Sequence, residues 1–136
     1  MSGYVYLTRR ERFSAAHRLH VSSFSDEKNT DLYGICNNPK GHGHNYEFFV
    51  TLRAIPDPVT GMIINLKDLK KIIKEKIVFK FDHKHLDEDL EEFRDIPSTV
   101  ENVAIVIWDL LKHDLPDLYE VKVVETENNS VAYRGE

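Results

Sequence analysis

The stretch His44-Asn-Tyr-Glu-Phe-Phe-Val-Thr-Leu-Arg-Ala-Ile55 predicts the strand around which the fold is built. Its aromatic and β-branched side chains favour an extended, half-buried backbone. The residues Pro56-Asp-Pro-Val-Thr-Gly61 follow at once and indicate a turn, because proline fixes φ and glycine permits positive φ. We therefore expect a long strand over residues 44–55 that ends in a turn.

Further strands are predicted on both sides of this one. Residues 4–16 carry apolar side chains at strand-like density, and residues 119–126 and 131–133 do so near the other end of the chain. Asn128-Asn129 lies between the last two segments and suits a hairpin turn, because asparagine tolerates left-handed backbone. The sequence thus predicts four strands.

Two helices are predicted between the second and third strands. One covers residues 65–78, with Asn65 as its cap, and its apolar residues recur at helical spacing. The other begins at Ser98-Thr-Val-Glu101, which has the spacing of a capping box. The order of elements predicts one α+β domain over residues 1–136, a four-stranded antiparallel sheet with both helices on one face. The edges of such a sheet invite pairing with another copy of the chain, so we expect a homo-oligomer.

The composition limits the class of protein. A formal net charge of −5 argues against a general nucleic-acid binder, which usually carries a basic face. No apolar run approaches the roughly 18–20 residues that cross a membrane, and the N-terminal residues do not form a secretory segment. A single cysteine cannot form an internal disulfide, so we expect a cytoplasmic protein.

Three histidines indicate a metal site. His42 and His44 alternate, and in a strand such residues face the same side about 6.6 Å apart. His17 lies at the end of the first predicted strand, where a hairpin would bring it beside the pair. Three imidazoles around zinc leave a coordination position open, as in catalytic sites. Short His-x-His motifs also arise by chance, and iron, nickel or copper would accept the same ligands.

The chain's one thiol, Cys36, lies just before the histidine pair. It lies near the end of the long polar segment from Val21 to Pro39, and loops of that length are commonly functional or disordered. Near a zinc cation the thiolate would be favoured and could act as a base. A small buried apolar residue and a fourth metal ligand are the alternative roles.

Asp82-His83 and Glu125 are the remaining candidates for chemistry. A carboxylate can orient a proton-transferring imidazole, but neighbours on a strand point apart, so Asp82 and His83 need a turn to meet. The alternative is that Asp82-His83 is a surface turn with no role in chemistry. Glu125 shares the parity of the apolar residues before it, and a buried carboxylate needs a partner. The two parallel N–H groups of a pterin or guanine would suit it; the alternative is an exposed strand end. His20 and His85 are expected at the surface.

Several motifs, taken in order, resemble the 6-pyruvoyl-tetrahydropterin synthase family of the animal type. They are Phe13-Ser-Ala-Ala-His-Arg-Leu-His20, Cys36-Asn-Asn-Pro-Lys-Gly-His-Gly-His-Asn-Tyr46, Asp57-Pro-Val-Thr-Gly-Met62 with Asn65-Leu66, Phe81-Asp-His-Lys84, Ser98-Thr-Val-Glu-Asn102 and Glu125-Thr-Glu-Asn-Asn129. The resemblance implies the tunnelling fold, in which three subunits close their sheets into a twelve-stranded barrel and two trimers stack into a homohexamer. It places the active sites between subunits.

The resemblance also implies a reaction and roles for named residues. The reaction is the zinc-dependent conversion of 7,8-dihydroneopterin triphosphate to 6-pyruvoyl-tetrahydropterin, with loss of triphosphate and an internal redox transfer. The implied roles are zinc ligation by His17, His42 and His44, base catalysis by Cys36, a proton relay of Asp82 and His83, pterin anchoring by Glu125, and a pocket lined by Thr99 and Thr126.

Two other functions remain open at the level of sequence. The related bacterial 6-carboxy-tetrahydropterin synthases of the deazaguanine pathway typically have a shorter interval between the cysteine and the first histidine. Here five residues separate Cys36 from His42, which favours the pyruvoyl synthase. A non-catalytic zinc or pterin-binding module would need neither Cys36 nor the Asp82-His83 pair.

Overall fold

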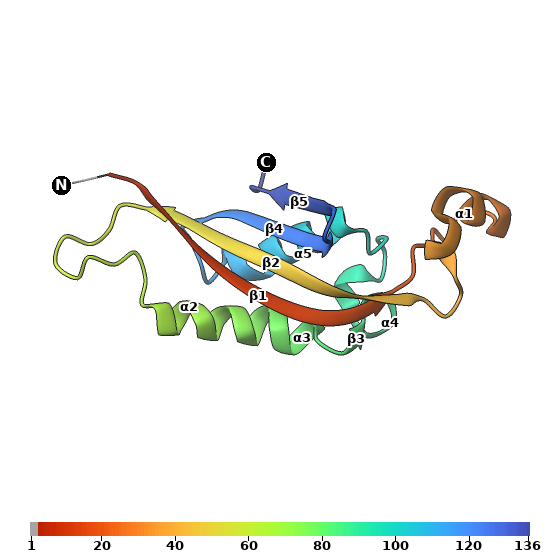
Figure 1. The fold of residues 1–136 in the computed structure, drawn as a ribbon, viewed down its shortest axis with the longest axis horizontal. Coiled ribbons are helices and arrows are strands. Elements are labelled where there is room, and N and C mark those ends of the chain that lie inside the picture. The colour runs from red at the N-terminus through yellow and green to blue at the C-terminus, as the bar shows by residue number, and fades with distance from the viewer. Residues whose placement is uncertain (1–2) are drawn as a thin grey trace.

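A twisted sheet forms the long axis of the molecule in the computed structural model, which describes residues 3–136 (Figure 1). The strand order is β3-β1-β2-β4-β5. The strands are β1 (Val5–His17), β2 (His42–Ala54), β3 (Lys84–His85), β4 (Leu118–Thr126) and β5 (Asn129–Tyr133). The four long strands pair antiparallel with one another, as the sequence predicts, and β2 begins two residues earlier than expected.

The register of β1 and β2 is unbroken over thirteen residues. It runs from Val5 opposite Ala54 to His17 opposite His42. Two predicted metal ligands therefore form a cross-strand pair at one end of the sheet.

One expectation about the sheet is wrong: it is mixed and five-stranded, because the two-residue strand β3 pairs parallel with β1 at Ala15 and Ala16. A strand of two residues is too short to show a periodic pattern in the sequence. Contacts distant in sequence hold it instead, since the His83 N–H donates to the Ser14 carbonyl oxygen at 2.6 Å.

The turn between β4 and β5 also differs from its prediction by one residue. Thr126 pairs with Asn129, so the turn consists of residues 127–128 and Asn129 is already in β5. The irregularity in β4 between Val124 and Thr126 accompanies this shift.

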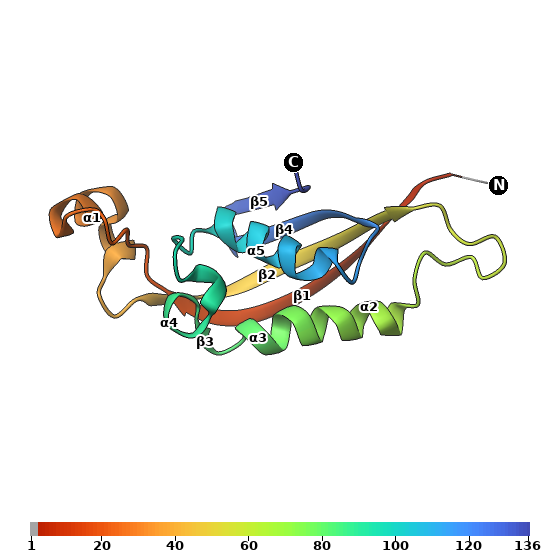
Figure 2. The ribbon, with the colours of Figure 1, turned by 180° about the vertical axis from the view of Figure 1, so that it is seen from behind.

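The two predicted helices cover one face of the sheet (Figure 2). The first, α2 (Leu66–Ile73), is capped by Asn65, whose side chain accepts the Lys67 N–H. It continues through a π-helical turn at Lys74–Val78 into α3 (Phe79–Phe81), three residues beyond the prediction. The second, α5 (Val100–Lys112), is capped by Thr99 rather than Ser98.

The core lies between these helices and alternate residues of the strands. Phe13, Phe48 and Val121 point into it from β1, β2 and β4, and Leu69 and Ile107 meet them from the helices; each is at most 2% exposed. Burying such a side chain stabilises the fold by about 1.5–3 kcal/mol relative to leaving it in water. The candidate site lies on the same face of the sheet, at the end where β1 finishes and β2 begins.

The segment from Val21 to Pro39 is not the structureless loop that the sequence suggested. It contains α1 (Asp26–Tyr33), capped by Ser25, and a 3-10 turn at Gly34–Asn37, and it projects beyond the end of the sheet (Figure 1). The fully buried Asn29 side chain holds it together by hydrogen bonds to the backbone of Val21 and Ser25.

A second short helical region, α4 (Leu86–Asp89), follows β3 and leads into a 3-10 turn at Glu91–Phe93. Leu86 and Phe93 are buried there, although the surrounding sequence is acidic. Among residues 3–136, none of the helices is both long and apolar enough to span a membrane.

Candidate metal centre

Three histidine side chains converge at the end of the helix-covered face of the sheet. His17 ends β1, His42 pairs with it across the sheet, and His44 follows two residues later on the same side of β2. One ring nitrogen from each lies within 4.8 Å of the other two. The ring centroids are 4.6, 5.1 and 4.9 Å apart. The structure thus brings together the three histidines that the sequence singled out.

Three ring nitrogens of the cluster have no hydrogen-bond partner within residues 3–136. They are His17 Nε2, His42 Nδ1 and His44 Nε2, and all three are buried. A buried polar atom without a partner is costly, so its position calls for an explanation. Three imidazoles that each bring one nitrogen within 4.8 Å of the other two fit a zinc ion, which would leave a coordination position open.

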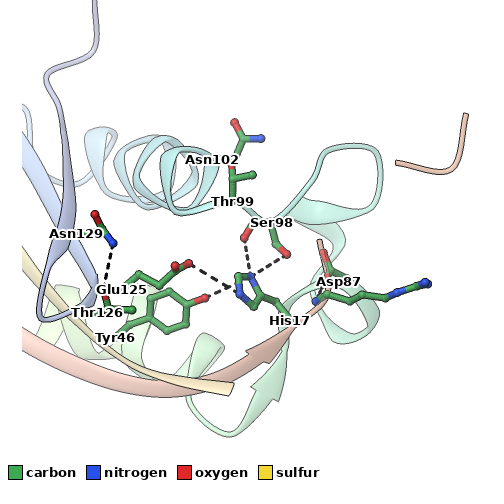
Figure 3. A network of polar contacts seen from close by, with 10 residues as sticks. His17, Tyr46, Asp87, Ser98, Thr99, Asn102, Glu125, Thr126 and Asn129 are labelled. Atoms are coloured by element: carbon green, nitrogen blue, oxygen red, sulfur yellow. Dashed lines mark hydrogen bonds and ion pairs between the residues drawn. The ribbon is translucent and has the colours of Figure 1, made fainter. Parts of the chain in front are cut away.

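The other nitrogen of the His17 ring is firmly held. Nδ1 lies 2.7 Å from the carbonyl oxygen of Ser98, and both residues are buried (Figure 3). A carbonyl oxygen only accepts, so Nδ1 carries the proton and Nε2 presents a lone pair. This is the usual outer contact of a metal-binding histidine.

Burial also favours the neutral form of two of the three rings. It lowers the pKa of His17 to about 4, with a smaller effect of the neighbouring histidines. Burial, followed by the nearby His44, lowers the pKa of His42 as well. Metal binding requires neutral imidazole, so both rings are in the competent form at neutral pH.

Gly41 is required at the entry to β2. Its φ is +78°, and a Cβ there would lie 2.9 Å from the His17 carbonyl oxygen and 3.1 Å from His85 Nε2. The first neighbour is backbone of a metal-site residue, so the chain must move to relieve the contact.

We expect Gly41→Ala to destabilise the protein by about 1–3 kcal/mol, the usual cost of overpacking, and to weaken metal binding. Urea unfolding and a zinc titration measure the two effects. Gly61→Ala is the matched control, because Gly61 has a similar φ of +73° but nothing within 4 Å of the added carbon. Equal effects from the two substitutions would contradict the close contact at Gly41.

Glu125 points into the same site from β4. Its Oε2 lies 3.9 Å from His17 Nε2, and its side chain is 22% exposed (Figure 3). Thr99, the cap of α5, directly follows Ser98, while Thr126 is exposed and its Oγ1 lies 3.5 Å from Asn129 Nδ2. A carboxylate thus borders the open side of the histidine cluster.

Cys36 lies in the 3-10 turn after α1 and is partly exposed. It does not belong to the group of three ligand atoms. Its carbonyl accepts the Leu19 N–H at 2.9 Å, and the Asn37 carbonyl accepts Arg18 Nε at 2.9 Å. The thiol is therefore anchored to the segment directly after His17.

Asp82 and His83 do meet, because His83 adopts a positive φ of 61° that makes the necessary turn. His83 Nδ1 lies 2.8 Å from Asp82 Oδ2. Asp82 Oδ1 accepts the Ser14 N–H at 2.8 Å, and this bond is the main reason that the pKa of Asp82 is lowered.

The Asp82–His83 pair faces solvent rather than the histidine cluster. The His83 side chain is 84% exposed, and no hydrogen bond within residues 3–136 joins the pair to the three histidines. An open groove of about 550 Å³ runs past it, lined by His83 and His85 on one side and His44 on the other.

Some contacts around the site were outside the sequence predictions. Ser98, expected as a helix cap, instead supports His17. Tyr46 is fully buried, with its hydroxyl 3.4 Å from His17 Nδ1, and burial raises its pKa so that it stays protonated. His20 and His85, expected at the surface, are only partly exposed; His20 Nδ1 receives Asn37 Nδ2, and His85 Nδ1 receives the Glu88 N–H.

A cluster of three histidines that could hold a metal ion lies beside a carboxylate at one end of the mixed sheet, an arrangement typical of metal-dependent enzymes. A family model described as 6-pyruvoyl tetrahydropterin synthase matches residues 6–136. The chain belongs to this family of enzymes, which confirms the resemblance drawn from the motifs.

Individual relatives agree over almost the whole chain. The 6-pyruvoyl tetrahydrobiopterin synthases of Homo sapiens and Poecilia reticulata are each 54% identical, over 96% of this chain and 91% and 90% of theirs. The solved structure of Caenorhabditis elegans 6-pyruvoyl tetrahydropterin synthase superposes with a TM-score of 0.95 at 42% identity and covers 98% of this chain and 97% of its own.

Proposed function

We propose that the chain converts 7,8-dihydroneopterin triphosphate to 6-pyruvoyl-tetrahydropterin, with elimination of triphosphate, in tetrahydrobiopterin biosynthesis. The observation that carries this proposal is the set of three buried, unpartnered imidazole nitrogens with Glu125 at their open side. Family membership over residues 6–136 and the named relatives support it.

Zinc is the proposed ion, held by one ring nitrogen each of His17, His42 and His44. When bound, it supplies a Lewis acid that favours ionisation of the substrate's side-chain hydroxyls. The His17–Ser98 bond keeps the first ligand in the binding tautomer, and burial favours the neutral form of His17 and His42.

The proposed proton transfers fall to Cys36 and to Asp82 with His83. Cys36 removes the acidic proton beside the pterin ring, and the other pair returns protons elsewhere, so that proton movement within the substrate becomes an internal redox transfer. Glu125 accepts the parallel N–H groups of the pterin and fixes which carbon faces the base. Thr99 and Thr126 line the pterin pocket.

Completion of the site by a second copy of the chain explains why the Asp82–His83 pair faces outward. Because the His83 side chain is 84% exposed, a second chain would have to cover the pair to enclose a substrate beside it. β5 forms one edge of the sheet. On the other side, β1 pairs with β3 only at Ala15 and Ala16, so most of the outer edge of β1 is also unpaired within residues 3–136. We propose that these edges join three sheets into a twelve-stranded barrel, and that two trimers form a cytoplasmic homohexamer.

Glu125→Gln removes one acceptor and the negative charge from the pterin contact. Charged hydrogen bonds contribute about 1.5–3 kcal/mol each, so we expect kcat/KM to fall roughly 10²-fold. Steady-state kinetics with zinc-loaded protein measure it. Glu127→Gln, in the exposed β4–β5 turn, is the matched control and should retain wild-type kinetics. Unchanged kinetics in Glu125→Gln would remove that carboxylate from the pterin site.

Incubation of zinc-loaded protein with 7,8-dihydroneopterin triphosphate tests the function. We expect release of inorganic triphosphate and formation of the 6-pyruvoyl product, identified by mass spectrometry. A 6-carboxy product would instead support the deazaguanine-pathway activity. Absence of triphosphate release from protein that retains zinc would leave only a binding module.

A further inference from the structure

The segment Pro97–Thr99 connects the metal centre to helix α5. Within it, the Ser98 carbonyl receives His17 Nδ1–H at 2.7 Å, and the Ser98 hydroxyl lies 3.3 Å from the same nitrogen. Because the principal acceptor is a backbone oxygen, its position depends on the conformation of the segment rather than on the side chain of Ser98. Something must therefore hold this short connection in place.

Asn102 provides two contacts to this connection. Its side-chain Nδ2 donates to the Pro97 carbonyl oxygen at 2.9 Å, and its backbone N–H donates to Thr99 Oγ1 at 3.3 Å. The contacts are to the residues directly before and after Ser98. In Figure 3, Asn102, Thr99, Ser98 and the His17 ring follow one another from top to bottom.

The two contacts have different consequences. The backbone contact caps α5 and would survive any substitution that keeps the helix. Only the side-chain amide reaches Pro97, which has no N–H of its own with which to fix its position. Asn102 Nδ2 therefore fixes the backbone at Pro97, the residue directly before Ser98.

We propose that Asn102 is a positioning residue of the metal centre, which holds the Ser98 carbonyl on His17 so that His17 Nε2 faces the ion. The inference rests on the proposed three-histidine site and assigns it an additional residue in α5. Asn102 does not contact the ion; it acts through Pro97, Ser98 and His17. Loss of the direct hydrogen-bond partner of a metal ligand typically lowers metal affinity about 10- to 100-fold, and displacement of the Ser98 carbonyl would remove that partner from His17.

Asn102→Asp tests the proposal with little change in volume. The carboxylate has no donor for the Pro97 carbonyl and repels it, while the backbone cap remains. We expect the Kd for Zn²⁺, measured against a competing chelator, to rise about 10-fold or more, and the visible absorption of the Co²⁺-loaded protein to change. Asn102→Ala should act in the same direction.

Asn65→Ala is the matched control, because Asn65 caps α2 at the other end of the molecule (Figure 1). We expect it to lower stability in urea by about 1 kcal/mol, as cap losses do, with a Zn²⁺ affinity within twofold of wild type. Wild-type affinity in Asn102→Asp would overturn the proposal. Equal losses of affinity in Asn102→Asp and Asn65→Ala would also do so, because they would reflect general destabilisation.

The tautomer of His17 gives a test that needs no variant. Nitrogen NMR of the metal-free wild-type protein should find His17 protonated at Nδ1, and a ring protonated at Nε2 would overturn the proposal. Failure of the proposed enzyme function has a different signature, namely wild-type protein that binds Zn²⁺ but releases no triphosphate.

Discussion

His42→Ala is expected to lose its bound metal and to lower the rate of triphosphate release by about 10³-fold or more. The substitution leaves two of the three histidines whose ring nitrogens now lie within 4.8 Å of one another. Loss of a Lewis acid removes several kcal/mol of transition-state stabilisation, and each 1.4 kcal/mol is about tenfold in rate. Metal analysis of the purified protein and a single-turnover assay measure the two losses.

The control for His42 is His113→Ala, an exposed histidine at the C-terminus of α5. It should keep both metal and activity. Circular dichroism establishes that both variants are folded. A folded His42→Ala protein with wild-type metal content and turnover would remove this residue from the centre.

Cys36→Ala is expected to lower kcat about 10²- to 10⁴-fold, the range that general base catalysis contributes, while zinc stays bound. The reason is the separation of roles in the structure, where the thiol lies outside the three-histidine group but is tied by its backbone to Leu19. Pre-steady-state kinetics and the zinc content of the same preparation give both quantities.

Loss of zinc from Cys36→Ala would make the thiol a ligand and would contradict its assignment as the base. Cys36→Ser keeps the size and polarity of the side chain and separates these outcomes further. A hydroxyl is a poor base at neutral pH, so this variant should be nearly as slow as Cys36→Ala. Wild-type turnover in both variants would show that another group removes the proton.

The four long strands could be predicted because their segments are rich in apolar, aromatic and β-branched residues, which favour an extended backbone. On β2 the buried side chains of Tyr46, Phe48 and Val50 share one face, and the same two-residue spacing places His42 and His44 together. Once the first strand is predicted to end near His17, a hairpin makes the three rings neighbours. The proximity of the three candidate metal ligands could therefore be predicted from local patterns in the sequence.

The missing parts depend on contacts between distant residues. Strand β3 exists because the backbone near Asp82 and His83 bonds to Ser14, and two residues have no pattern of their own. The cap of α5 was assigned one residue too early, since Ser98 and Thr99 are both good caps. The tertiary requirement that Ser98 support His17 decides between them. Likewise, nothing local shows whether Asp82 and His83 face a site or the solvent.

The cross-strand pairing of His17 with His42 has a mechanical consequence. The chain leaves the sheet at His17, travels through residues 18–41, including α1 and Cys36, and returns at His42. An ion held by both residues fastens the two ends of this excursion together, much as a disulfide closes a loop. A ligand that binds only the folded state also raises the free energy of unfolding. The chain has one cysteine and therefore cannot form an internal disulfide. The ion would serve both as a Lewis acid in the reaction and as a crosslink between the two ends of this segment.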